Sequence, residues 1–108
     1  EEYIRKMPKS VLQSNWYYSS FLQEKGKEEA KGIRAYRILE ENGYDQVLTG
    51  SNWCRAYNFQ ETVDFGMKTI GKERLKGFLQ TPWVPTVKET KYRHFEAVDL
   101  VRQAISKL

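Results

Sequence analysis

The chain of 108 residues is poor in the residues on which several kinds of chemistry depend. Cys54 is its only cysteine, so no disulfide can form within the chain, and the redox compartment stays open. His94 is its only histidine, and no cluster of histidine, cysteine or carboxylate residues has the spacing of metal ligands. We therefore expect no metal, no cofactor and no catalytic thiol.

Long apolar runs and glycine-rich motifs are also lacking. No stretch approaches the roughly 20 apolar residues of a membrane helix, and no signal-peptide pattern is visible, so we expect no membrane partner. The glycines do not form a phosphate-binding GxGxxG pattern, and no serine has the context of a nucleophile elbow.

Charge of one sign is not segregated along the chain. The net charge of +4 results from 18 basic and 14 acidic residues that are interspersed, which is typical of a solvated surface. The densest basic stretch, residues 25–34, also contains Glu28 and Glu29 and follows Glu24. Nucleic-acid binding through cations and stacking aromatics is therefore a less favoured alternative, and we expect no nucleic-acid partner.

What the chain does contain is enough apolar material for a packed core, with 40% hydrophobic and 14% aromatic residues. Its length corresponds to one small domain or to a fragment of a larger one. The sequence begins with Glu1, which we interpret as a processed or excised segment whose native start lies elsewhere, although a purification artefact is the alternative.

Three strand-like runs end in tryptophan, at residues 11–16, 47–53 and 78–83, and each precedes a polar loop and a helical pattern. The pattern predicts strands at about 11–15, 46–49 and 76–81. It predicts helices at about 27–42, 59–70 and 90–106. Strands that alternate with helices imply a parallel sheet with right-handed crossovers. The predicted fold class is α/β, with three consecutive βα units in a single partial-barrel domain over residues 1–108.

The second predicted helix has the clearest local signals. Asn58 and Glu61 are spaced as in a capping box, which predicts the start of the helix there. An apolar stripe follows at positions that repeat with helical period: Phe59, Val63, Gly66, Met67 and Ile70. If this stripe packs on the sheet, Val63→Asp or Met67→Asp unfolds the domain by burying an unpaired charge.

The three tryptophans predict a binding face, because ligands of parallel α/β folds bind at the carboxyl ends of the strands. An indole face can stack on a sugar ring, and polar neighbours such as Asn15, Asn52 and Thr81 can bond its hydroxyl groups. The alternative is that the indoles cap the inner layers of a barrel core. The predicted substrate-binding residues are Trp16, Trp53, Trp83, Asn15, Asn52, Tyr17 and Arg55. Tyr18 and Tyr57 lie in the same loops and are candidate second-line contacts, although loop surface residues need no function.

Two phrases carry a resemblance to a known family. Residues 8–17 read PKSVLQSNWY, and residues 42–53 read NGYDQVLTGSNW. They resemble the later strands of the catalytic barrel in family 20 glycoside hydrolases, the β-N-acetylhexosaminidase type, and in their bacterial relatives. The resemblance covers residues 7–108 and corresponds to the last three βα units of a (β/α)8 barrel. It implies aromatic walls of a sugar pocket and an extracytoplasmic location, because such relatives are commonly exported.

The chain departs from this family at the catalytic pair. The family uses an adjacent Asp-Glu at the end of an earlier strand, and no Asp-Glu dipeptide occurs here. Asp45 lies at the amino end of the second predicted strand, which is the wrong end. Hydrolysis of a glycosidic bond ordinarily needs two carboxylates across the scissile bond. We therefore expect no catalytic residue in this chain and no hydrolysis by the chain alone.

Two hypotheses of function result. In the first, the chain is a fragment of a carbohydrate-active enzyme and contributes aromatic sugar-binding residues, while N-terminal barrel units contribute the acid and base. In the second, it is a noncatalytic α/β ligand-binding module that associates with further copies of itself. The second follows from the two open edges and apolar helix faces that three parallel strands leave.

Overall fold

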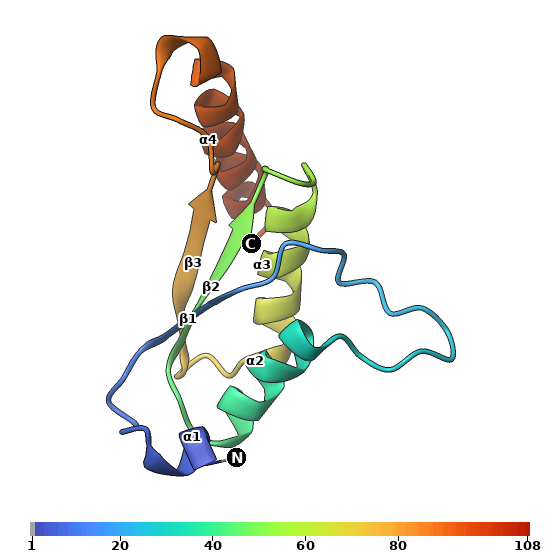
Figure 1. Ribbon diagram of the computed structural model, residues 1–108, viewed down its shortest axis with the longest axis vertical. Coiled ribbons are helices and arrows are strands. Elements are labelled where there is room, and N and C mark those ends of the chain that lie inside the picture. The colour runs from blue at the N-terminus through green and yellow to red at the C-terminus, as the bar shows by residue number, and fades with distance from the viewer. Residues whose placement is uncertain (1) are drawn as a thin grey trace.

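Strands and helices alternate along the chain in a computed structural model that describes residues 2–108 (Figure 1). The elements are α1 (Glu2–Lys6), β1 (Gln13–Trp16), α2 (Lys31–Glu41), β2 (Gln46–Ser51), α3 (Asn58–Thr69), β3 (Leu75–Thr81), the 3-10 helix η1 (Lys88–Thr90) and α4 (Lys91–Ser106). The predicted βα alternation is confirmed.

The three strands form one parallel sheet in the order β1-β2-β3. Residues 13–16 of β1 pair with residues 46–49 of β2, which confirms the predicted parallel arrangement. On the other side of β2, Gln46 pairs with Leu75 and Ser51 pairs with Thr81, with one shift of register between Gln46 and Val47. Within residues 2–108, β1 and β3 each have one edge without a partner strand. The fold is therefore of the predicted α/β class.

Helices α2, α3 and α4 pack on one face of the sheet (Figure 1). Tyr36 of α2 and Leu48 of β2 are fully buried and share a core cluster. A second cluster joins Val63 of α3 to Ala104 of α4, with Phe78 of β3 packed against both. Helix α3 comes close to the sheet at Gly66, where a Cβ atom would lie 2.7 Å from the Phe78 ring.

No helix within residues 2–108 packs on the opposite face of the sheet. Alternation along the strands places Trp16, Thr49 and Leu79 on this uncovered face, and these three residues are neighbours in the register of the sheet. Leu79 is 49% exposed there. Parallel sheets in proteins usually have both faces covered, so this face is suited to contact with further protein.

Two predicted element starts are too early. Val11 and Leu12 are exposed and precede β1, because Val11 N–H donates to the Pro8 carbonyl in a turn. The first long helix begins at Lys31 and not at Lys27. A turn in which Lys27 N–H donates to Glu24 O, with Gly26 at a φ of +82°, keeps the preceding residues out of the helix.

The predicted capping box of α3 is wrong. Tyr57 is the residue that caps the helix, and no side chain bonds a backbone N–H there as a cap. Asn58 lies inside the first turn, and its buried amide joins the end of β2 and the loop after β1 to α3. Its Oδ1 accepts from Ser51 N–H at 2.9 Å, and its Nδ2 donates to the carbonyls of Tyr17 and Ser19 at 2.8 and 3.1 Å.

The predicted stripe of α3 is correct at Phe59, Val63, Gly66 and the following Ile70, which are all buried. It is wrong at Met67, which is 50% exposed. Half of the Met67 surface is open to solvent, so a charge at this position is not fully buried. The expectation that Met67→Asp unfolds the domain is therefore not supported.

Helix α1 was not among the predicted elements. It is held at the amino end of the sheet by Tyr44, whose hydroxyl lies 2.8 Å from the Ile4 carbonyl and 2.7 Å from the Met7 carbonyl. Among residues 2–108, no helix combines the length and the apolar character that crossing a membrane requires.

Candidate functional site

Three aromatic residues gather where β1 and β3 end. Trp16 is the last residue of β1, and its ring stacks on Tyr18 with the centroids 4.9 Å apart and an interplanar angle of 25°. Trp83 lies two residues after β3, and its Nε1 donates to the Tyr18 hydroxyl at 2.7 Å. We call Trp16, Tyr18 and Trp83 the aromatic rim. Two of the three predicted tryptophans thus meet at the carboxyl edge of the sheet.

The rim is anchored to the sheet by a directed chain of hydrogen bonds. An indole N–H can only donate, so the Tyr18 oxygen accepts from Trp83. The Tyr18 hydroxyl can then donate to Thr81 Oγ1 at 3.1 Å, and Thr81 Oγ1 donates to the Gly50 carbonyl at 3.2 Å. This series of hydrogen bonds leads from the indole of Trp83 to the backbone of β2. Each of the two hydroxyl groups in it donates one bond and accepts one bond.

The indoles of the rim are open to solvent. Trp16 is 64% exposed and Trp83 is 60% exposed, although large aromatic residues usually bury most of their surface. Both therefore present apolar ring surface that a ligand can cover. In this chain they do not fill a core, which was the alternative for their role.

Trp53 is separate from the rim. It is exposed in the loop after β2, and its backbone N–H donates to Ser51 Oγ at 3.0 Å. Within residues 2–108, no aromatic ring pair includes Trp53. The structure does not bring the third predicted tryptophan into the same cluster.

Asn52 is buried and fastens α4 to the end of β2. Its Nδ2 donates to the Arg93 carbonyl at 3.1 Å and to Glu96 Oε1 at 2.7 Å. In return, Arg93 Nη1 donates to the Asn52 carbonyl at 3.0 Å. The expected bond from the Asn52 amide to a sugar hydroxyl is not the arrangement seen, because the amide points into this network.

Asn15 and Tyr17 lie toward the helix layer. Asn15 pairs with Leu48, a core residue, and its carbonyl accepts from the Tyr36 hydroxyl at 3.1 Å. Tyr17 is half-buried and meets Phe21 edge to face, with the centroids 5.2 Å apart. Neither residue therefore lies in the rim.

Arg55 is engaged with α3. Its Nη2 lies 3.5 Å from Glu61 Oε1, and Glu61 Oε2 accepts from Phe21 N–H at 2.9 Å. This pair holds the loop after β2 and the loop after β1 to the start of α3. The ion pair of Arg55 is thus with α3 and not with the rim.

Tyr18 was predicted only as a second-line loop contact, and Thr81 only as a polar neighbour for sugar hydroxyl groups. Tyr18 follows Trp16 by two positions, and the period of two in an extended chain places both side chains on one side. This spacing was a usable signal. The meeting of Tyr18 with Thr81 and Trp83 was not, because it depends on the arrangement of β1 and β3 on either side of β2.

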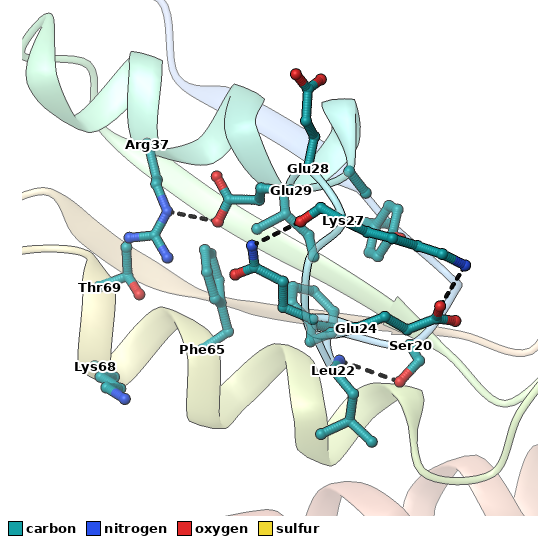
Figure 2. Close-up of a pocket in the computed structure, with 15 residues that line it drawn as sticks. Ser20, Leu22, Glu24, Lys27, Glu28, Glu29, Arg37, Phe65, Lys68 and Thr69 are labelled. Carbon is teal, nitrogen blue, oxygen red and sulfur yellow. Dashed lines mark hydrogen bonds and ion pairs between the residues drawn. The ribbon is translucent and has the colours of Figure 1, made fainter.

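A separate cavity lies away from the rim. It has a volume of about 540 Å³ and lies between the loop of residues 17–30 and helices α2 and α3 (Figure 2). Its wall includes Phe65 and the ion pair in which Arg37 Nε lies 2.8 Å from Glu29 Oε1. None of the three tryptophans lines it. Its wall carries charges of both signs, among them the ion pairs Arg37–Glu29 and Lys27–Glu24, and indicates no particular ligand.

Groups for covalent or metal chemistry do not converge on the rim. Among residues 2–108, no three histidine, cysteine or carboxylate residues are placed to hold a metal ion. Two carboxylates, Glu61 and Glu96, bond the backbone of Phe21 and the amide of Asn52. The arrangement supports recognition through ring stacking more than it supports chemistry.

No protein-family model matches this chain, and comparisons with curated proteins and with solved structures give no significant match.

Proposed function

We propose that this chain is a carbohydrate-binding part of a glycoside-hydrolase-like βα barrel and that its aromatic rim stacks on sugar rings. The observation that carries the proposal is the exposure of Trp16 and Trp83 in one anchored cluster at the carboxyl edge of a parallel sheet. Indole faces bind the apolar faces of sugar rings, and this edge is where ligands of parallel α/β folds bind.

The resemblance of residues 8–17 and 42–53 to family 20 glycoside hydrolases supports a sugar as the ligand. The lack of an Asp-Glu pair supports binding without hydrolysis by this chain. In this proposal, the acid and base belong to further βα units, which also pack on the face of the sheet that is bare in this chain. Export from the cell is an expectation that comes from the resemblance alone.

The test is a titration of the chain with N-acetylglucosamine oligomers, in which tryptophan fluorescence is measured at each step. We expect Trp16→Ala and Trp83→Ala each to weaken binding by about tenfold, which corresponds to about 1.4 kcal/mol for a lost stacking contact. Tyr57→Ala is the matched control, because Tyr57 is an exposed aromatic outside the rim. The proposal fails if no oligomer changes the fluorescence, or if all three variants bind as the wild type does.

A second candidate function is a noncatalytic module that associates with its own copies. The solvent-accessible surface is 7702 Å². A compact protein of 12.8 kDa exposes about 6,300 Å², so this chain exposes about 1,400 Å² more. A standard protein interface covers about 800 Å² on each partner. The excess is sufficient for a stable contact over the uncovered face and the strand edges.

Light scattering across a range of protein concentrations tests this candidate. We expect a mass that is a multiple of 12.8 kDa if copies cover the exposed surface. A mass of one chain at every concentration contradicts self-association and leaves further βα units as the cover for the sheet.

A further inference from the structure

We infer that Tyr18 is the residue that positions Trp83 in the aromatic rim, and that the rim takes a carbohydrate of at least two linked sugar units. The second statement rests on the proposed function. The first concerns only the rim itself.

Tyr18 joins the two tryptophans by two different contacts. One face of its ring stacks on Trp16, and its hydroxyl accepts the indole N–H of Trp83. No ring pair within the described part of the chain joins Trp16 directly to Trp83. The two indoles therefore form two separate surfaces with the phenol of Tyr18 between them.

The backbone at Trp83 needs such support. Trp83 has a φ of +50° and is the only residue other than glycine with a positive φ in residues 2–108. This conformation is unfavourable for a bulky side chain, and it persists only where surrounding contacts hold it. Pro82 and Pro85 stiffen the same loop, and the bond to Tyr18 fixes the indole at its end.

The hydroxyl of Tyr18 is fully used in this role. It accepts from Trp83 and donates its single proton to Thr81, whose own hydroxyl donates to the Gly50 carbonyl. The hydroxyl of Tyr18 consequently has no proton for a ligand. It acts on a ligand through the placement of the Trp83 ring.

Two separate indole surfaces determine the length of the ligand. A single sugar ring can cover one indole, whereas contact with both Trp16 and Trp83 requires a second, linked sugar unit. The exposed faces of both indoles make this contact possible from the solvent side. A longer carbohydrate therefore gains affinity only while Tyr18 holds Trp83 in place.

The first experiment needs no ligand. Tyr18→Phe keeps the ring that stacks on Trp16 and removes the hydroxyl that binds Trp83. We expect the NMR signal of the Trp83 indole N–H, assigned with Trp83→Phe, to shift and to exchange faster with solvent in Tyr18→Phe. The Trp53 indole signal is the internal control. An unchanged Trp83 signal with unchanged exchange overturns the positioning role.

The second experiment compares N-acetylglucosamine with its linear dimer and trimer. We expect the wild-type chain to bind the dimer about tenfold more tightly than the monosaccharide. In Tyr18→Phe, we expect this preference to fall below about twofold, because Trp83 is no longer held in place. Tyr57→Phe, a change of the same kind outside the rim, keeps the preference.

The outcomes separate the two proposals. Equal affinity of the wild-type chain for the monosaccharide and dimer overturns the two-unit ligand but leaves sugar binding in place. An equal loss for every probe in Tyr18→Phe shows that the hydroxyl supports the whole rim and overturns its specific action on Trp83. The absence of binding to all three probes overturns both the proposed function and the two-unit ligand, while the indole signal still decides the role of Tyr18.

Discussion

Tyr36 shows how one buried side chain joins two layers of the structure. Its ring is fully buried among the core residues of α2, α3 and β2, and its hydroxyl donates to the Asn15 carbonyl of β1 at 3.1 Å. Burial raises the pKa of Tyr36 well above its ordinary value, and the nearby Tyr18 adds to the effect. The folded chain therefore holds the phenol in its neutral form.

This raised pKa predicts a loss of stability in alkali. An unfolded tyrosine ionises with a pKa of about 10, so the contribution of Tyr36 to the free energy of unfolding is complete below pH 10. It is lost as the pH rises from there toward the higher pKa of the folded state. We expect Tyr36→Phe to lower the free energy of unfolding by about 1 kcal/mol at pH 7 and to reduce its decline above pH 10.

Urea unfolding at several pH values measures both effects. Tyr57→Phe is the control, because Tyr57 is exposed and its replacement leaves the alkaline decline unchanged. If Tyr36→Phe and the wild type lose stability equally between pH 9 and pH 11, other groups cause the decline.

At the scale of elements, the sequence predicts what depends on periodicity. The helical stripe of α3 and the strand-like runs before each tryptophan identified the order and type of the main elements. Their ends depended on contacts between distant segments. Asn58 has the spacing of a helix cap, but its amide bonds Ser51 N–H and the Tyr17 carbonyl, which only the folded chain brings near.

The sequence likewise predicted part of the candidate site. The positions of Trp16 and Trp83 at strand ends were visible in the sequence, and both lie in the rim. The burial of Asn52 was not visible, because it results from the docking of α4 on the end of β2. Sequence alone does not distinguish an amide that faces a ligand from one that faces a helix.

Helix α3 allows a paired test of its two sides. Val63 is 2% exposed and Met67 is 50% exposed, although both belong to the same apolar repeat. We expect Val63→Asp to unfold the chain, because it buries a charge without a partner. We expect Met67→Asp to change the free energy of unfolding by less than about 1 kcal/mol. Thermal melting followed by circular dichroism measures both, and equal melting of the two variants contradicts the packing described.

At the scale of the whole molecule, the main feature is the face of the sheet that no helix within residues 2–108 covers. The radius of gyration of the chain is 14.9 Å, which exceeds the roughly 13 Å expected for a compact chain of this length. The excess comes with one bare sheet face and the extended loop of residues 17–30 (Figure 1). Contact with further protein would reduce the exposed surface without any change in the core.

Leu79 and Met67 provide a matched test of that face. Leu79 lies on the uncovered face and is 49% exposed, whereas Met67 lies on α3 with 50% exposure. If copies of the chain associate through the uncovered face, we expect Leu79→Lys to lower the association constant at least tenfold and Met67→Lys to leave it unchanged. Analytical ultracentrifugation measures the constant, and an equal effect of both changes places the contact elsewhere.

The order of the strands has a further consequence. Because β1, β2 and β3 lie side by side in the order in which they are synthesised, each new strand can dock on the one made before it. No segment has to insert between two that have already paired. A duplication of one βα unit in the gene would likewise add a strand at an open edge and leave the existing pairs intact. The same arrangement that leaves edges exposed thus permits growth by simple addition.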